Sequence, residues 1–419
     1  MNSGTVLLVG CPINQASRCI SQAKARGLQV VVLETAELIE KGQAVLSAAD
    51  QIVTMPSKAV FHVKKWLEGQ PEFPKIDHIL TFSEYAVEAT ALIAQYLNLP
   101  WNTPDSIRVI KDKFLLRNRL KEKGFNQPDI AACSTIQEAI RFLEQSGRRG
   151  PWIVKPRIGL GSEGVSIVRQ KSDLQAAFDN LSQEDRQAFL IEEYVFGQEY
   201  SVEGVLISGE AQFFGITKKL LIDNDTFIEC GHIIPAPISK NLAQKIYAEV
   251  RNAIDAVELR YGLFHVEFWV NEDVITLGEI HARPGGEFIN WLTELATDIE
   301  TYGIALDDLL GRVVPPPVAW PSNDYVFSKS AGINYLQPAP GIIEQMGDLE
   351  SIRQHPNCVR LHCTLRTGDT VPEVTSWKDL ESIGYLIVSG ETSEQVEQYL
   401  RHFQQEAAII TRPNTQMKS

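Results

Sequence analysis

The sequence lacks the features of a secreted, disordered or membrane protein. Its 419 residues include six cysteines, and no C-x-x-C pair suggests a disulfide scaffold. No apolar run approaches the length of a membrane span, and the amino terminus lacks the basic region and apolar core of a signal peptide. Long tracts of Pro, Ser or Gln are also absent. We therefore expect a folded, cytoplasmic protein with reduced cysteines and no membrane partner.

Positive charge is also scarce. The 53 Asp and Glu residues outnumber the 39 Lys and Arg residues, which gives a formal net charge of −14. Proteins that bind nucleic acid need Lys and Arg to displace the counterions around the phosphates, so the composition argues against that partner. A single nucleotide needs only a few well-placed cations and amides. The length and an apolar fraction of 44% suit a globular enzyme of several domains.

Hydrophobic periodicity divides the chain into four parts. Residues 1–108 show the strand–helix–strand rhythm of a Rossmann-like parallel sheet. We expect a flap-bearing unit over residues 109–190 and a unit of alternating strands and helices over residues 191–310. Residues 311–419 suggest a small α+β domain, entered through the Pro-rich linker VVPPPVAWP at 313–321. The predicted fold class therefore combines α/β and α+β parts.

Two glycine-containing segments do not fit a dinucleotide site. The segment GCPI at 10–13 lacks the glycine fingerprint that admits a pyrophosphate after a first strand. The G-x-G-x-x-G match at 159–164 joins two predicted strands instead of opening a helix. Between strands, such glycines form a flap whose backbone N–H groups can close over phosphates, although a plain hairpin turn would look similar. Lys155, just before the flap, is placed to contact the same phosphates.

The segment EEYVFGQEYSVEG at 192–204 crosses between two units. It is expected to end a strand, form a short hinge and begin the next strand. Backbone groups near Glu193 and Val195 are suited to pair with an adenine edge. Tyr194 would pack against the ring, and Glu199 would accept hydrogen bonds from both ribose hydroxyls. The alternative is a pair of ordinary acidic surface residues.

The stretches FHVEFWV and VITLGEIHARPGG predict a β-hairpin that carries two acids. We expect Val270 to pair with Val274 across a three-residue turn. Strand alternation then places Glu267 and Glu279 on one face, and a two-residue turn would break this register. Neighbouring carboxylates repel, and a divalent cation relieves that cost while it bridges phosphate oxygens. Mg²⁺ is the expected ion, with Mn²⁺ as a substitute.

Together these motifs resemble the ATP-grasp superfamily, most specifically over residues 113–287 and close to its amino-acid ligase branch. The resemblance implies an N-terminal Rossmann-like domain, a central flap subdomain, a catalytic subdomain and a small C-terminal α+β domain. It implies an ATP-dependent carboxylate–amine ligase that forms an amide through an acyl phosphate and releases ADP and phosphate. Its partners would be small, amino-acid-like carboxylates and amines, and the resemblance also implies a homodimer.

The resemblance further assigns roles to individual residues. Those implied for ATP are Lys113, Lys155, Gly159, Gly161, Ser162, Gly164, Glu192, Glu193, Tyr194, Val195, Glu199 and Lys219. Those implied for the metal are Glu267, Glu279 and His281. Those implied for stabilising the tetrahedral oxyanion are Arg283, Gly285 and Gly286. Those implied for substrate are Glu229, His232 and Glu287.

Two details leave alternatives open. His281 stands where the family motif has an asparagine, so its imidazole is either a metal ligand or a substrate contact. The segment FIECGHIIPAP at 227–237 looks like the substrate-site segment of amino-acid ligases. There Glu229 would attract an ammonium group and His232 would accept a proton from the attacking amine. The alternative for this segment is a surface loop with incidental polar groups.

Two other functions share parts of the pattern. A biotin-carboxylase-like enzyme has the same nucleotide site, but the likeness at 227–237 weighs against it. A nonenzymatic nucleotide-binding protein would keep the cleft without turnover, and the retention of Lys155, Glu267 and Arg283 weighs against that interpretation. The sequence does not identify the carboxylate, the amine or the pathway.

Overall fold

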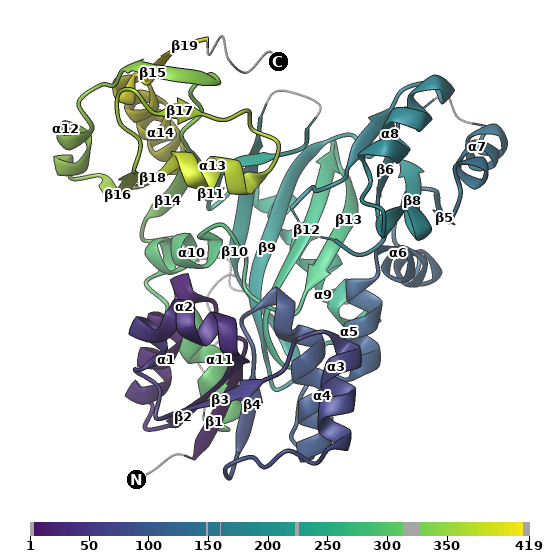
Figure 1. Ribbon diagram of the computed structural model, residues 1–419, viewed down its shortest axis with the longest axis vertical. Coiled ribbons are helices and arrows are strands. Elements are labelled where there is room, and N and C mark those ends of the chain that lie inside the picture. Colours follow the sequence, from purple (N-terminus) through teal and green to yellow (C-terminus); the bar gives the residue numbers. More distant parts are fainter. Residues whose placement is uncertain (1–3, 148–149, 160, 223–225, 313–326, 414–419) are drawn as a thin grey trace.

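The computed structural model describes residues 4–147, 150–159, 161–222, 226–312 and 327–413. Figure 1 shows the amino-terminal unit below a central sheet, a flap-bearing unit at the upper right and the carboxyl-terminal unit at the upper left. The predicted linker at 313–321 lies outside the described residues. Within them, no helix has both the length and the apolar character needed to cross a membrane.

The amino-terminal unit is a parallel sheet, as the sequence predicts, and its strand order is β3-β2-β1-β4. Its strands are β1 (Thr5–Val9), β2 (Gln29–Thr35), β3 (Gln51–Met55) and β4 (His78–Leu80). Its helices are α1 (Ile13–Ala25), α2 (Ala36–Leu46), α3 (Val60–Glu68), the short η1 (Glu84–Ala86) and α4 (Val87–Leu97). The strands β1 and β2 are almost wholly buried apolar runs, which is typical of a parallel sheet covered on both faces.

The flap-bearing unit is an antiparallel sheet with the order β5-β8-β6-β7. Its strands are β5 (Ile130–Cys133), β6 (Trp152–Pro156), β7 (Ser166–Val168) and β8 (Phe189–Glu193). Its helices are α7 (Ile136–Gln145) and α8 (Leu174–Asn180), and it follows α5 (Pro104–Lys111) and α6 (Lys113–Glu122). The glycine loop connects β6 and β7, which pair with each other, so its strand-to-strand context is as predicted.

The central sheet has eight strands in the order β13-β12-β9-β10-β11-β14-β18-β16. The first five in chain order are β9 (Gln198–Ile207), β10 (Glu210–Leu221), β11 (Glu229–Ile234), β12 (Gly262–Asn271) and β13 (Val274–His281). The other three are β14 (Ser330–Tyr335), β16 (Cys358–Cys363) and β18 (Gly384–Gly390). The helices of this region are α9 (Lys240–Ala256), α10 (Ile289–Thr297) and α11 (Thr301–Leu309).

The carboxyl-terminal unit adds a small sheet and three helices. The small sheet has the order β17-β15-β19. Its elements are β15 (Gly341–Gln345), α12 (Leu349–Gln354), β17 (Thr370–Val371), α13 (Trp377–Ile383), α14 (Ser393–Ala407) and β19 (Ile410–Arg412). Because β14, β16 and β18 continue the central sheet, this unit is joined to β11 by backbone hydrogen bonds. The division into four domains remains a prediction.

Helix α6 begins at the lysine that the sequence assigned to phosphate. Asp112 caps the helix, because its Oδ1 accepts hydrogen bonds from the N–H groups of Phe114 and Leu115 at 3.0 and 3.2 Å. Gly124 follows the helix with φ of +88°, a left-handed conformation that suits glycine. The cap therefore fixes the backbone of Lys113 at the first turn of α6.

The hairpin of β12 and β13 differs from its predicted register. Val274 pairs with Asn271 and not with Val270, so the turn has two residues instead of three. The predicted register at the turn is therefore wrong. By strand alternation alone, this shorter turn would place Glu279 on the face opposite Glu267.

A β-bulge brings the two acids back together. The register shifts between Val266 and Phe268. One residue of β12, Glu267, therefore faces two residues of β13, Gly278 and Glu279. The extra residue returns Glu279 to the face of Glu267. The prediction that both carboxylates share one face thus agrees with the structure, but for a different reason.

Arg117 of α6 anchors this bulge. Its side chain is 1% exposed and donates to the carbonyls of Leu277, at 3.2 Å, and Gly278. Its Nε also donates to Glu192 of β8 at 3.2 Å. One buried guanidinium therefore ties the flap-bearing sheet to the place where the acids are set.

The segment expected to be a loop at 227–237 is largely a strand. Glu229–Ile234 form β11, which pairs with β10 on one side and β14 on the other. His232 on this strand is fully buried. The surface-loop interpretation is therefore wrong, because Gly231 lies within this interior strand and Pro235 directly follows it.

We predict that Gly278→Ala lowers the free energy of unfolding by about 1–3 kcal/mol through overpacking. A Cβ at this position would lie 2.9 Å from the Trp269 ring and 3.1 Å from the Glu267 carbonyl oxygen. Thermal and denaturant unfolding measure the effect. Gly390→Ala is the control, because a Cβ there meets nothing closer than 3.4 Å. Equal stability of the two variants would show that the bulge tolerates a side chain.

Candidate active site

A cavity of about 780 Å³ lies where the four parts of the chain meet. Each part contributes an ionisable residue to its lining, namely Glu84, Lys155, Glu267 and Glu381. Most residues assigned to ATP, metal or substrate from the sequence line this cavity. Among the described residues, the assigned ones outside its lining are Gly164, Glu193, His232 and Gly285.

The two lysines assigned to phosphate lie on the flap side of the cavity. Lys113 Nζ donates to the carbonyl of Gly159 at 2.8 Å and lies 3.3 Å from Glu279. Lys155 forms an ion pair with Glu192, and both side chains are buried. Burial lowers the pKa of Lys155 even though Glu192 opposes this effect. The structure thus brings the flap, its lysines and one predicted metal ligand into contact.

The glycine flap is closed over the cavity. Ser162 Oγ donates to the carbonyl of Phe227 at 3.0 Å, and Glu163 pairs with Lys378 of α13 at 2.6 Å. Gly161 and Gly164 have φ of +64° and +73°. These left-handed conformations favour glycine, so the glycines are needed for the path of the loop.

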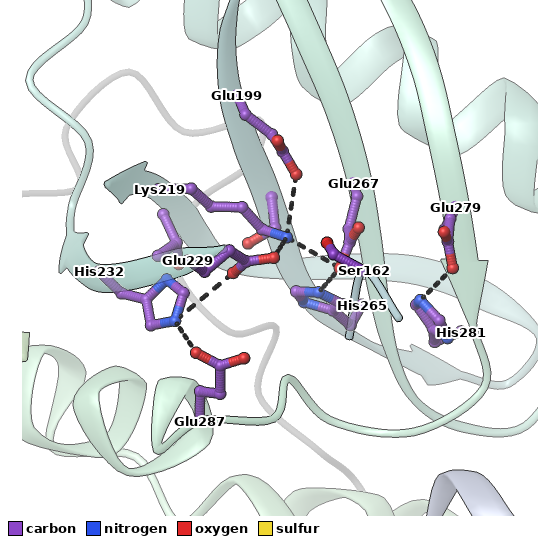
Figure 2. A network of polar contacts seen from close by, with 12 residues as sticks. Ser162, Glu199, Lys219, Glu229, His232, His265, Glu267, Glu279, His281 and Glu287 are labelled. Carbon is purple, nitrogen blue, oxygen red and sulfur yellow. Dashed lines mark hydrogen bonds and ion pairs between the residues drawn. The ribbon is translucent and has the colours of Figure 1, made fainter. Parts of the chain in front are cut away.

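Lys219 is enclosed by carboxylates (Figure 2). Its Nζ lies 2.8 Å from Glu229, 2.9 Å from Glu267 and 3.3 Å from Glu199. Burial alone would lower the pKa of Lys219, but these three acids outweigh it and raise the pKa well above its usual value. Burial and the neighbouring acids raise the pKa of Glu199 to about 7, although Lys219 opposes them. Lys219 is therefore the cation that makes this concentration of negative charge tolerable.

Glu267, Glu279 and His281 form a group with suitable atoms for a metal. Their donor atoms lie within 4.8 Å of one another. His281 Nδ1 lies 2.9 Å from Glu84, and Nε2 lies 3.4 Å from Glu279. A carboxylate behind Nδ1 fixes the imidazole so that Nε2 faces the other donors, which is the usual support for a metal-bound histidine. The chemistry of this set fits a divalent cation.

Glu84 is a buried site residue that the sequence reasoning missed. It accepts a hydrogen bond from Arg283 Nε at 2.8 Å and from Lys111 at 2.7 Å, and it also contacts His281. Burial would raise its pKa, but His281, Arg283 and Lys111 hold the pKa well below its usual value. Its position just after β4 was an available signal, because ligands bind beyond the carboxyl ends of strands in parallel sheets.

His265 is a second residue that the sequence reasoning missed. Its Nδ1 lies 3.0 Å from both oxygens of Glu203, and its Nε2 lies 3.0 Å from Glu267. Burial would lower the pKa of His265, but the two carboxylates outweigh it and raise the pKa to about 9. Strand alternation could have placed His265 on the same face as Glu267, because the two residues are two positions apart on one strand.

The three residues assigned to substrate are clustered, but they differ in access. His232 Nε2 lies 3.2 Å from Glu287 and 3.6 Å from Glu229, as Figure 2 shows. Its Nδ1 is buried without a hydrogen-bond partner in the described structure. Glu229 and Glu287 line the cavity, whereas His232 lies behind them. The geometry therefore does not give His232 the direct substrate contact that the sequence suggested.

The hinge residues are only partly directed at the cavity. Tyr194, Val195 and Glu199 line it. The N–H of Glu193 donates to the Asp129 carbonyl at 2.9 Å, and its side chain does not line the cavity. Glu193 as a whole is absent from the cavity lining, so the structure does not place it against an adenine there.

The glycines after Arg283 also differ from each other. Gly286 lines the cavity, whereas Gly285 is packed below it. A Cβ on Gly285 would lie 2.7 Å from Ile289 and 2.9 Å from Glu203. Close packing therefore explains Gly285, and Gly286 is the glycine with access to a ligand.

Comparison with known proteins identifies two conserved modules in the chain. Residues 148–290 match the family model of the ATP-grasp domain, and residues 334–412 match that of L-amino acid ligase C-terminal domain 2. The L-amino acid ligase of Bacillus licheniformis has a similar structure, with a TM-score of 0.76 and 21% identity over 98% of this chain and 100% of that chain. The predicted ATP-grasp resemblance and fold are thereby confirmed.

Two curated relatives are similar in sequence. The chain is 29% identical to the ATP-grasp enzyme fsqD of Aspergillus fumigatus over 286 residues, which are 62% of this chain and 48% of that protein. It is 28% identical to a D-alanine–D-alanine ligase of Geobacillus kaustophilus over 208 residues, which are 46% of this chain and 56% of the ligase. The chain thus spans about half the length of these relatives.

The raised pKa of His265 predicts a specific dependence of stability on pH. Its folded-state pKa of about 9 exceeds the ordinary value of 6.5, so the ion pairs of His265 stabilise the fold fully below pH 6.5. This contribution, up to about 3 kcal/mol, is lost as the pH rises through 9. Denaturant unfolding from pH 6 to 10 should show a weaker decline in His265→Gln than in the wild type.

The control for this experiment is His402→Gln, because His402 lies on the surface and pairs only with Glu406 at 3.4 Å. This variant should keep the wild-type dependence on pH. If His265→Gln and the wild type declined equally, His265 would not be the group that links stability to pH.

Proposed function

We propose that this chain, which contains an ATP-grasp domain and an L-amino acid ligase C-terminal domain, is an ATP-dependent carboxylate–amine ligase. The observation that carries the proposal is the 3.3 Å contact between Lys113 and Glu279. It joins the phosphate side of the cavity to the paired acids of the hairpin. A nucleotide triphosphate held between the flap and the hairpin would have its terminal phosphate at this contact.

The proposed nucleotide position follows from the lining of the cavity. Lys113, Lys155 and the flap amides would neutralise the phosphate charge. Val195 at the hinge would present its N–H to the adenine edge, and Glu199 would accept hydrogen bonds from the ribose. Closure of the flap over these groups would exclude water from the reacting phosphate.

The acids at the bulge would hold Mg²⁺, with Mn²⁺ as a substitute. Glu267 and Glu279 supply the carboxylate oxygens that a hard cation prefers, and His281 supplies an imidazole nitrogen nearby. When bound, such a cation neutralises charge on the phosphate oxygens. Lys219 already contacts Glu267 at 2.9 Å, so it would share this acid with the ion.

The proposed reaction has two steps. A carboxylate oxygen of the first substrate attacks the γ-phosphorus, the bond from this phosphorus to the bridging oxygen breaks, and ADP leaves. The amine nitrogen then attacks the carbonyl carbon and loses a proton, and inorganic phosphate leaves as the amide forms. Arg283, oriented by Glu84 at 2.8 Å, and the Gly286 amide would stabilise the oxyanion between attack and departure.

The substrates are proposed to be amino acids or close analogues. Two of the relatives are named as ligases of amino acids, one for L-amino acids and one for D-alanine. Glu229 and Glu287 also give the cavity carboxylates that would attract an ammonium group. These points support a pair of amino-acid substrates and do not distinguish which amino acids they are.

We predict ADP formation in a one-to-one ratio with a new amide, dependent on Mg²⁺. Nucleotide chromatography and mass spectrometry of the products would measure both. In the absence of an amine substrate, hydroxylamine should trap the activated carboxylate as a hydroxamate. Stoichiometric AMP would instead indicate adenylation, and ADP release with bicarbonate alone would indicate a carboxylase.

We also predict that Glu279→Gln lowers kcat by about 100-fold or more, as expected when charge stabilisation of the transition state is lost. The same change should weaken Mn²⁺ binding measured by electron paramagnetic resonance. Asp273→Asn is the matched control, because Asp273 lies in the same hairpin with a side chain that is 80% exposed. Unchanged ion binding and turnover in Glu279→Gln would remove the proposed metal site.

A further inference from the structure

One end of the cavity is both acidic and aromatic. Glu287 and Phe288 reach it from the loop before α10, Tyr335 from the end of β14, and Glu381 from α13. Tyr335 and Glu381 belong to the carboxyl-terminal unit, which carried no residue in the site predicted from sequence. A substrate that extends to this end therefore meets groups beyond those that hold the nucleotide.

Several polar groups at this end of the cavity can form further hydrogen bonds or ion pairs. Tyr335 is 1% exposed, yet its hydroxyl forms no hydrogen bond within the described structure. Glu381 likewise has neither an ion pair nor a hydrogen bond among the described residues. Glu287 has one close partner, His232 at 3.2 Å. Tyr335 lines the cavity, so its hydroxyl is free to hydrogen-bond to a ligand there, beside the two carboxylates.

The basic residues around this end are already engaged elsewhere. Lys378, one turn before Glu381 on α13, pairs with Glu163 of the flap at 2.6 Å. Lys219 is held by its own three carboxylates. Arg360 lies over the ring of Tyr385, 5.6 Å from its centroid. Glu381 therefore forms no ion pair within the described structure, although His362 acts on it electrostatically, and Glu287 is partly offset by His232 and Lys219.

The backbone holds Glu287 and Phe288 in an unusual conformation. Their φ angles are +45° and +64°, in the left-handed region that is strained for residues other than glycine. The hydrogen bond from His232 and the packing of Phe288 on Tyr385, with ring centroids 4.6 Å apart, maintain it. A strained segment at a cavity wall is typical of groups that are fixed for ligand contact.

We propose that this end of the cavity binds a cationic group that the substrate carries in addition to its reacting groups, namely the side-chain ammonium or guanidinium of a basic amino acid. The inference rests on the proposed ligase function. One carboxylate, Glu229 or Glu287, suffices for the α-ammonium of an amino acid. Glu381, Tyr335 and the face of Phe288 then remain, and carboxylates beside an aromatic face are a favourable environment for a second cation.

A metal ion fits this end less well. The donor atoms of Glu229, His232 and Glu287 do lie within 4.8 Å of one another. A metal-bound histidine, however, gives its other N–H to an acceptor, and the Nδ1 of His232 has no partner in the described structure. His232 is better suited to donate from Nε2 to Glu287 and so to position that carboxylate.

The proposal is tested with L-lysine and L-norleucine, which have side chains of similar length but differ in the terminal ammonium. Each is supplied with ATP, Mg²⁺ and a panel of amino acids as the second substrate. The wild type should favour L-lysine by at least about tenfold in kcat/KM, the factor that one charged contact provides. Glu381→Gln should remove most of this preference. Glu394→Gln is the control, because it removes the same charge from an exposed residue of α14, and this variant should keep the preference for L-lysine.

Two further measurements separate this inference from the proposed function. Mass spectrometry of the product shows whether L-lysine supplies the carboxylate or the amine, and either order agrees with the proposal. Calorimetry with ADP and Mg²⁺ measures binding of both amino acids without turnover. Hydroxamate formation without any preference for L-lysine would overturn the cation site and keep the ligase. Selective binding of L-lysine that Glu381→Gln abolishes, without ATP turnover, would support the site and overturn the ligase.

Discussion

The need to neutralise buried carboxylates determines how the cavity is built. A carboxylate taken out of water without a partner costs several kcal/mol, so the most deeply buried acids of this cavity lie beside a cation or a hydrogen-bond donor. Lys219 serves three acids, and Arg117 and Lys155 share Glu192. Glu84 of the amino-terminal unit binds Arg283, which follows β13 of the central sheet. Because the charges come from different parts of the chain, pairing them also fixes those parts against one another.

Local patterns in the sequence were enough to find the elements of the site, but not the contacts between them. The glycine flap and the acidic hairpin could be predicted because their residues are close in sequence and follow strand periodicity. Glu84 and Arg283 are 199 residues apart, and Arg117 and Glu192 are 75 apart. No periodicity links residues at such distances. The contribution of Glu381 was missed for the same reason, since it depends on how the carboxyl-terminal unit joins the central sheet.

The hairpin shows a different limit of sequence reasoning. The expected three-residue turn was wrong, yet Glu267 and Glu279 share a face because a bulge at Gly278 adds one residue to β13. A glycine within a strand indicates a bulge or a close backbone approach, but it does not say which. Here both apply, because the carbonyl of Gly278 accepts from Arg117 and its Cα packs near the Trp269 ring. The register therefore depends on a tertiary contact that the strand sequence does not contain.

Helix α13 carries Lys378, which holds the flap through Glu163, and Glu381, which faces the cavity one turn later. The side chains of the Lys378–Glu163 pair are 58% and 56% exposed, and pairs of this kind contribute about 1 kcal/mol or less. In the proposed ligase, a pair this weak could break and re-form in every catalytic cycle. Because a short helix moves as one body, a ligand that binds Glu381 would also stabilise the Lys378–Glu163 ion pair. Hydrolysis of a reactive intermediate would then be slowest when substrate fills the cavity. The bound substrate itself would thus determine how long the flap stays closed.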